Sequence, residues 1–256
     1  MSIKRLFKNF DVMDNIDFSK IKGIIFDYGG TIDSKGDHWS IVIRNAYQRA
    51  GVLVEDEAFR DAYVYAEREL ARTLHILPHH NFHDLLLIKM RIELQYLAEG
   101  QFFPAEQVEP KAKEIAGYCY QAARDCIEQA RPVLEELHKR YPMVLVSNFY
   151  GNVEAVLKDF DLRRYFSQIV ESAVVGVRKP DPRIFELGLQ ALNLPAGQVL
   201  VVGDSYKKDI VPAMSLGCPA VWLKGRGWTA EEDSVLHPAT IGDLGEVLCF
   251  LEGIDG

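Results

Sequence analysis

The chain contains 256 residues, of which 48 % are hydrophobic, 26 % charged and 11 % aromatic. This composition is typical of a globular protein with a buried core, and it excludes a disordered, collagen-like or disulfide-stapled chain. The 29 basic and 37 acidic residues give a net charge of −8. A dedicated nucleic-acid binder carries a basic surface, so we expect no nucleic-acid partner.

The N-terminal 20 residues mix basic and acidic side chains and lack the unbroken apolar run of a signal peptide. No later segment approaches the ~20 apolar residues that a membrane helix needs. The four cysteines, Cys119, Cys126, Cys218 and Cys249, form no C-x-x-C pair and have no histidines at zinc-finger spacing. We therefore expect reduced thiols, a cytoplasmic location and no membrane partner.

Four short apolar runs end in polar or glycine-containing turns, at residues 24–26, 143–146, 199–202 and 220–223. Such runs predict strands that are buried on both faces, as in a parallel sheet. Helical patterns follow most of them, and we expect helices at 132–141, 152–160, 182–192 and 209–216. Strands and helices in alternation predict a doubly wound, Rossmann-like α/β fold, whose ligands bind beyond the carboxyl ends of the strands.

One long interval breaks this alternation. Between residues 34 and 131 the apolar residues recur at three- and four-residue steps, most clearly over 59–74, 83–97 and 108–130. We interpret residues 34–130 as an inserted α-helical domain over the active edge of the sheet. Residues 1–33 and 131–256 then form the α/β core.

Four polar clusters fall directly after predicted strands or in the loops between them. They are Asp27-Tyr28-Gly29-Gly30-Thr31, Ser147-Asn148, Arg178-Lys179-Pro180, and the segment from Gly203-Asp204-Ser205 to Asp209. These loops converge in a parallel sheet, so three carboxylates, a hydroxyl and a lysine would surround one point. Oxygen ligands for Mg²⁺, a cation against phosphate charge and a free carboxylate nucleophile are typical of a phosphoryl-transfer site.

The segments IIFDYGGT, VLVSN, VRKPDP and VVGDSYKKD resemble, in order, the four motifs of the haloacid dehalogenase superfamily of phosphatases and related hydrolases. The helical insert lies where many members carry a helical cap domain. The resemblance implies an Mg²⁺-dependent hydrolase, most simply a phosphoric monoester hydrolase acting on a small phosphorylated molecule through an aspartyl-phosphate.

The resemblance also implies a role for each motif residue. Asp27 would be the nucleophile, while Ser147 and Lys179 would assist catalysis. Thr31, Ser147, Asn148 and Lys179 would bind the phosphoryl group. Mg²⁺ would be held by Asp27, the Gly29 carbonyl, Asp204 and Asp209.

One position departs from the family pattern. Family phosphatases carry a second aspartate two residues after the nucleophile, where it protonates the leaving oxygen, and here that position is Gly29. Acid–base catalysis contributes about 10² to 10⁴ in rate, so an alkyl ester would react slowly unless another group substitutes. Acyl, aryl or anhydride leaving groups need little protonation, the insert could supply an acid, or the substrate could assist itself.

Several side chains are candidates for a replacement acid or a second ligand site. Asp33 follows the first motif, although such a residue is more often a helix cap or a turn residue. Four histidines cluster in the insert, at His75, His79, His80 and His83. The step between His79 and His83 suits a shared helix face and a zinc ion, although lining of the insert's surface or of the substrate pocket is the simpler interpretation.

Three alternatives to a phosphatase remain at this stage. Phosphonate-cleaving relatives carry a small residue at the position of Gly29 and a cap lysine that forms a Schiff base, for which Lys89 is the candidate. A haloacid dehalogenase needs no metal, which would leave Asp204 and Asp209 without a role. A third alternative is a phosphate-binding or regulatory protein that has lost catalysis with its acid–base group.

Overall fold

The computed structural model describes residues 18–252 of the chain, and the predicted boundaries at residues 1 and 256 lie outside that range. Six parallel strands form one sheet in the order β3-β2-β1-β4-β5-β6. The strands are β1 (Gly23–Phe26), β2 (Met143–Ser147), β3 (Gln168–Glu171), β4 (Val199–Gly203), β5 (Ala220–Leu223) and β6 (Thr240–Ile241). The predicted doubly wound α/β fold is therefore confirmed. The strands β3 and β6 were not predicted, because QIVE begins and ends with a polar residue and TI has only two residues, so neither forms an unbroken apolar run.

Ten α-helices accompany the sheet in the described part of the chain. They are α1 (Trp39–Arg49), α2 (Asp56–Arg72), α3 (Phe82–Glu99), α4 (Val108–Arg140), α5 (Val153–Asp159), α6 (Ser172–Val175), α7 (Arg183–Leu192), α8 (Val211–Ser215), α9 (Ala230–Ser234) and α10 (Glu246–Glu252). A π-helical turn, Tyr206–Ile210, precedes α8, so the helix predicted over 209–216 is split in two.

Alternate side chains of the buried strands pack into two separate cores, one on each face of the sheet. Ile24 and Phe26 of β1 join the core that also contains residues of α1–α4. Ile25, which lies between them, joins the core formed with Phe185 of α7 and Ala213 of α8. This alternation follows from the two-residue period of a strand, and it explains why the strand sequences are apolar throughout.

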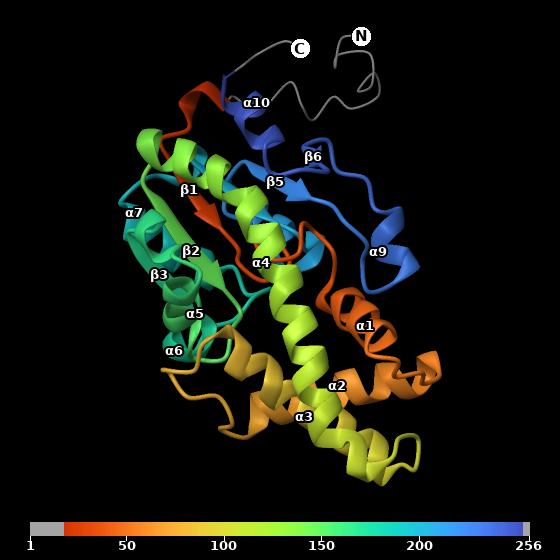
Figure 1. The fold of residues 1–256 in the computed structure, drawn as a ribbon. Helices are drawn as coiled ribbons and strands as arrows, with labels where there is room; N and C mark the ends of the chain where they lie inside the picture. Colours follow the sequence, from red (N-terminus) through yellow and green to blue (C-terminus); the bar gives the residue numbers. More distant parts are fainter. Residues whose placement is uncertain (1–17, 253–256) are drawn as a thin grey trace.

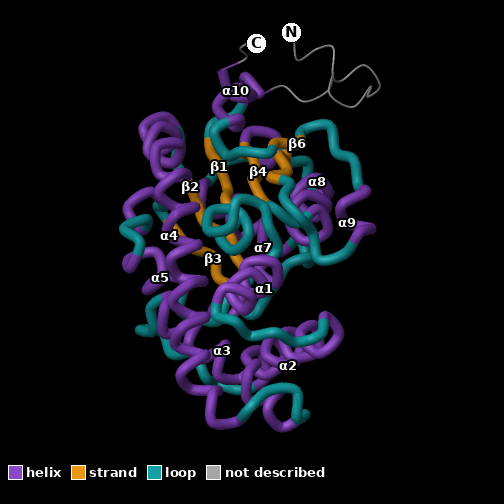
Figure 2. The backbone as a smooth tube through the Cα atoms, turned by 45° about the vertical axis from the view of Figure 1, so that its right-hand side comes forward, coloured by secondary structure: helices purple, strands orange, loops and turns teal. Residues whose placement is uncertain are grey.

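Helices α1, α2 and α3 and one end of α4 lie beyond the sheet, on the side toward which β1 points (Figures 1 and 2). The interval 34–130 contains no strand among its residues, all of which the structure describes, as its periodicity predicts. Its assignment as a separate cap domain stays a prediction. None of the helices between residues 18 and 252 combines the length and the apolar character needed to cross a bilayer.

The helices predicted over 108–130 and 132–141 are one continuous helix, α4, with Pro132 in its interior. Proline removes a backbone N–H and crowds the preceding turn, at a cost of about 3 kcal/mol. The prediction of a helix start was wrong because the apolar stripe does not stop there. Ile127, Ala130, Leu134 and Leu137 are all buried and continue the three- and four-residue spacing across the proline.

Candidate active site

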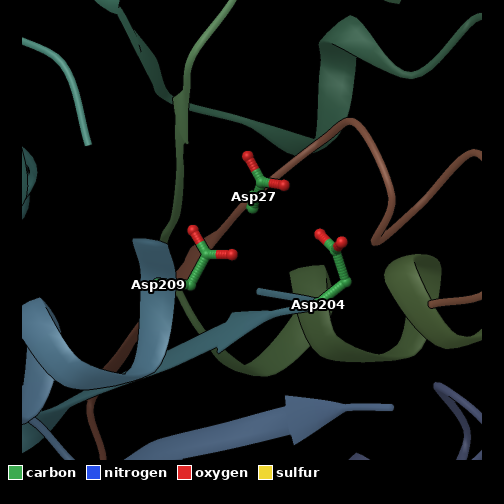
Figure 3. A group of neighbouring side chains, drawn as sticks. All are labelled: Asp27, Asp204 and Asp209. Carbon is green, nitrogen blue, oxygen red and sulfur yellow. The ribbon is translucent and has the colours of Figure 1, made fainter. Parts of the chain in front are cut away.

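Three carboxylates meet where β1 and β4 end. Asp27 follows β1, Asp204 follows β4, and Asp209 lies in the π-helical turn after it. Each residue has a carboxylate oxygen within 4.8 Å of an oxygen from the other two, and Figure 3 shows the three groups side by side. The topology explains the meeting, because β1 and β4 are neighbours in the sheet and point the same way.

Two glycines allow the carboxylates to come this close. Gly30 has a positive φ of +97°, and a Cβ on it would lie 2.3–2.5 Å from the Asp204 carboxyl group. A Cβ on Gly203 would lie 2.4–2.7 Å from atoms of Asp209. Any larger residue at either position would push a carboxylate away, so the backbone at both places is fitted to the acidic cluster.

Lys179 provides the positive charge in this cluster. Its buried Nζ donates to Asp27 Oδ1 at 2.5 Å and to Asp209 Oδ1 at 2.6 Å. Burial lowers the pKa of Lys179, but the carboxylates of Asp209 and Asp27 outweigh that effect and hold the pKa above its ordinary value. The lysine therefore stays charged and links the nucleophile candidate to the π-helical turn.

The acidic cluster carries more negative charge than one lysine neutralises. Burial and the nearby carboxylates of Asp27 and Asp209 raise the pKa of Asp204 well above its ordinary value. Burial also raises the pKa of Asp209, and Lys179 offsets this only in part. Clustered, buried oxygen donors of this kind fit a hard divalent cation such as Mg²⁺.

Thr31 and Asn148 hold the cluster in place. The Thr31 hydroxyl lies 3.0 Å from Asp204 Oδ1 and 3.3 Å from Asp27 Oδ2, so it can donate to either. The Asn148 side chain accepts from the Lys179 backbone N–H at 2.9 Å and donates to the Lys179 carbonyl at 3.0 Å. Asn148 thus fixes the backbone of the lysine whose ammonium reaches Asp27.

A cavity of about 610 Å³ opens over this cluster. Asp27, Gly29, Asn148 and Lys179 line it together with Asp204 and Asp209, whereas Ser147 and Thr31 are buried outside its lining. Ser147 ends β2 beside Glu171 of β3. The roles assigned by resemblance to all eight residues stay predictions.

Gly29 is not required by the backbone. It has no positive φ, and a Cβ added there would meet no atom within 4 Å. The position where the resemblance implies an aspartate therefore lies on the wall of the cavity and has room for a side chain.

Asp33 does not face the cavity. Its carboxylate accepts from the Gly30 N–H at 2.7 Å and from the Trp39 indole N–H at 3.1 and 3.2 Å. Burial raises the pKa of Asp33 to about 7 despite these two donors. The turn-forming role is the one that its contacts support, since these bonds close the loop that carries the nucleophile candidate.

The histidine cluster of the insert is also away from the cavity, because none of His75, His79, His80 and His83 lines it. Among the described residues, Asp27, Asp204 and Asp209 form the one group of His, Cys, Asp and Glu side chains placed to hold a metal. A zinc site at His79 and His83 is therefore not formed. Of the two simpler interpretations, lining of the insert's surface fits these exposed or half-buried histidines, and lining of the substrate pocket does not. The cysteines are free thiols.

Sequence reasoning missed much of the cavity wall. Glu67 of α2, Tyr150 of the loop after β2 and the exposed cations Arg68, Lys207 and Lys208 all line it. The two lysines lie inside the fourth motif, between Asp204 and Asp209. Their position between two predicted site residues could have indicated that they lie near the cavity. Glu67 and Arg68 lie on an amphipathic helix whose pattern does not reveal what its polar side faces.

Lys89, the Schiff-base candidate, also lines the cavity. It is buried and forms an ion pair with Glu67. Burial lowers the pKa of Lys89, but Glu67 reverses the effect, so the pKa lies above its ordinary value. A Schiff-base lysine must be neutral to attack a carbonyl carbon, and this environment favours the opposite state.

Comparisons with known proteins place the chain among hydrolases. A sequence model of the family described as haloacid dehalogenase-like hydrolase matches residues 21–217. A phosphoserine phosphatase from Thermus thermophilus is 31 % identical over 157 residues, covering 56 % of this chain and 63 % of that protein, less than two thirds of its length. A glyceraldehyde 3-phosphate phosphatase from Pyrococcus furiosus is 35 % identical over 213 residues, covering 80 % of this chain and 81 % of that protein.

Solved structures show the same fold. The putative HAD-hydrolase YfnB from Bacillus subtilis, solved with magnesium, superposes with a TM-score of 0.56 at 16 % identity, covering 91 % of this chain and 99 % of that one. A 2-haloacid dehalogenase from Pseudomonas syringae superposes with a TM-score of 0.51 at 21 % identity, covering 91 % of this chain and 99 % of that one. The matched family model spans most of the chain and all four motifs. The protein therefore belongs to the haloacid dehalogenase-like hydrolase family.

Proposed function

We propose that this protein is an Mg²⁺-dependent phosphatase that hydrolyses a small phosphorylated metabolite through an aspartyl-phosphate on Asp27. The observation that carries the proposal is the meeting of Asp27, Asp204, Asp209 and Lys179 at the floor of one cavity. The relatives named as phosphatases of phosphoserine and glyceraldehyde 3-phosphate support the same reaction class.

The metal would be held by Asp27, Asp204 and Asp209, with the Gly29 carbonyl as a further ligand. When bound, Mg²⁺ would offset phosphoryl charge and bring the two anions, carboxylate and phosphate, together. The crowding of three carboxylates that raises the pKa of Asp204 supports a cation at this place.

The side chains of this protein would then act in sequence. A carboxylate oxygen of Asp27 attacks phosphorus, the bond from phosphorus to the leaving oxygen breaks, and the leaving group departs as an anion with that bond's electron pair, taking any proton it needs from water. Lys179 holds Asp27 and supplies positive charge beside the transferring group. Water then hydrolyses the aspartyl-phosphate, which releases phosphate and restores Asp27.

Gly29 makes leaving-group chemistry decisive. No side chain at this position can protonate the departing oxygen, so we infer that acyl and aryl phosphates react faster than simple alkyl esters. The helices α1–α3 and one end of α4 would form the cap domain, residues 34–130, that closes the cavity over the substrate. The thiols and the composition support a cytoplasmic location.

The test is a phosphate-release screen over sugar, nucleotide, acyl and aryl phosphates with Mg²⁺. Asp27→Asn should abolish release of phosphate from every substrate, because an amide does not attack phosphorus. Asp61→Asn, an exposed change on α2, is the matched control and should retain activity. Equal turnover by Asp27→Asn would refute the proposal, as would chloride release from a haloacid in EDTA. Metal-dependent binding of phosphate esters without any turnover would identify a binding protein instead.

A further inference from the structure

The cavity has a second polar region besides the acidic cluster. Much of the wall is aromatic or aliphatic, and Trp39, Val64, Phe82, Leu85, Leu86 and Phe149 are examples. Within this apolar wall, Glu67 of α2, Lys89 of α3 and Tyr150 of the loop after β2 form one hydrogen-bonded cluster. We call these three residues the roof cluster.

The contacts of the roof cluster are specific. The Lys89 ammonium donates to Glu67 Oε1 and lies 4.2 Å from the centre of the Tyr63 ring. The Tyr150 hydroxyl lies 3.0 Å from both Glu67 carboxylate oxygens, to which it donates. Only 5 % of the Lys89 side chain is exposed, against 37 % of the Glu67 side chain. The carboxylate is therefore more open to the cavity than the ammonium group is.

Hydrogen bonds to Glu171 and Ser172 fix the loop that carries Tyr150. The carboxylate of Glu171 in β3 accepts from the Gly151 N–H at 2.5 Å and from the Val153 N–H at 3.4 Å. The Phe149 N–H donates to the Ser172 hydroxyl at 3.3 Å. The loop that carries Tyr150 is thus anchored on both sides, so the position of Glu67 is fixed by the core as well as by its own helix.

The roof cluster has unused hydrogen-bonding capacity. A lysine ammonium has three N–H donors and a carboxylate can accept about four hydrogen bonds, and these exceed the contacts made here. The charges of Glu67 and Lys89 cancel within the pair. Such a site favours a neutral group that both donates and accepts, and a hydroxyl is the simplest group of that kind.

We propose that Glu67 and Lys89 bind a hydroxyl group of the substrate, so that the protein selects phosphorylated molecules whose organic part carries hydroxyl groups. This inference rests on the phosphatase activity proposed above. The hydroxyl donates to the open Glu67 carboxylate and accepts from Lys89, while the carbon skeleton packs on the aromatic wall. Tyr150 is a positioning residue that orients the carboxylate.

Two other substrate classes fit less well. A second anionic group bound at the roof cluster itself would need an unpaired cation, and Glu67 already neutralises Lys89. An amino-acid zwitterion would present its carboxylate to Lys89 and its ammonium to Glu67, which requires the two side chains to separate. Separation of a largely buried ion pair is costly, since each charge loses its partner.

The experiment compares two esters with the same primary-alcohol leaving group, ribose 5-phosphate and n-pentyl phosphate. We expect kcat/KM of the wild-type protein to be at least tenfold higher for ribose 5-phosphate. Glu67→Gln and Lys89→Met should each reduce that ratio at least tenfold, mainly through KM. Tyr150→Phe, which removes only the hydroxyl, should reduce it less, and Glu109→Gln on the surface of α4 should leave it unchanged.

Folding of each variant is checked by circular dichroism and thermal melting, and Tyr150→Phe keeps the test available if Lys89→Met does not fold. A ratio unaffected by Glu67→Gln and Tyr150→Phe in folded protein overturns the proposal, as does a higher kcat/KM for phosphoserine than for ribose 5-phosphate. If no ester is hydrolysed, the phosphatase proposal fails. Calorimetric titration of both esters into Asp27→Asn protein with Mg²⁺ then still decides whether the hydroxyl-bearing ester binds more tightly.

Discussion

At the scale of single residues, Gly29 provides no acidic group although there is room for a side chain at its position. The resemblance to the family implies an acid–base aspartate here, yet the residue is glycine, and a side chain at this position would meet no atom within 4 Å of its Cβ. Gly30, the next residue, is the opposite case, because its positive φ and the adjoining Asp204 leave no room for a Cβ. One glycine is therefore replaceable and its neighbour is not.

We predict that Gly29→Asp raises the rate on alkyl phosphates by about 10²- to 10⁴-fold, the range that acid–base catalysis contributes. The gain should be much smaller on aryl phosphates, whose leaving oxygens need little protonation. The measurement is kcat on both ester types. Gly29→Asn is the control for side-chain size, and if it accelerated the reaction as much as Gly29→Asp, proton transfer would not be the cause.

A second residue-scale prediction concerns Glu93, which is fully buried in α3 and accepts from the Tyr47 hydroxyl at 3.1 Å. Burial raises its pKa to about 7. A carboxyl group with a raised pKa in the folded state stabilises the protein below its ordinary pKa, and this stability is lost as pH rises through about 7. The wild-type protein should therefore lose stability between pH 5 and pH 8.

Glu93→Gln should remove this part of the pH dependence, because the amide does not ionise. Relative to the wild type, the variant should gain about 1–3 kcal/mol of unfolding free energy from pH 5 to pH 8, as measured by urea titration at each pH. Glu99→Gln, an exposed change on the same helix, should follow the wild type. Parallel curves for Glu93→Gln and the wild type would show that Glu93 is already ionised at pH 5.

At the scale of secondary-structure elements, α4 connects the sheet to the helices over the cavity (Figure 1). It contributes buried residues to the core along its whole length, from Ala112 to Leu137. Because its apolar stripe continues across Pro132, burial of that stripe keeps the helix continuous, and the proline only lowers its stability.

We predict that Pro132→Ala stabilises the protein by about 1–3 kcal/mol. Pro132 is exposed, so alanine loses little packing there, and it restores an N–H that can donate within the helix. Thermal and urea unfolding measure the change. Pro104→Ala, which lies before the turn Ala105–Gln107, is the control and should not stabilise. An unchanged or lower stability of Pro132→Ala would mean that the helix requires the bend at this residue.

At the scale of the whole molecule, the proposed metal binding at the acidic cluster would be coupled to folding. The native fold brings Asp27, Asp204 and Asp209 together, and unfolding disperses them, so a cation that binds the cluster stabilises the folded state. Mg²⁺ at 100 times its dissociation constant should add about 2.7 kcal/mol to the unfolding free energy.

We predict that Asp204→Asn is more stable than the wild type without Mg²⁺ and less stable than the wild type with it. In EDTA the variant should unfold at a higher temperature than the wild type, because one of three crowded carboxylates is gone. In Mg²⁺ the order should invert, because the variant loses a ligand. Differential scanning calorimetry at matched ionic strength measures both. Equal Mg²⁺ stabilisation of the two proteins would place the cation elsewhere.

Much of the core could be read from the sequence alone. Strands such as VLVVG are buried on both faces, so their apolar runs are unambiguous, and each polar motif directly follows a strand or lies in a loop between strands. Since parallel strands align their carboxyl ends, the sequence was sufficient to predict that Asp27, Lys179 and Asp204 lie together. It also determined that residue 29 offers no acid.

Only the tertiary structure shows which partners the polar side chains of the insert contact, because the periodicity of the sequence does not determine them. An amphipathic helix shows which side is apolar, but the partner of each polar residue depends on how helices pack. Glu67 and Lys89 are 22 residues apart, and Tyr150 lies 83 residues from Glu67, so no local pattern relates them. The same holds for the histidines, whose spacing suits a shared site but whose side chains lie outside the cavity. Contacts between distant segments are set by the whole fold, and only the structure reveals them.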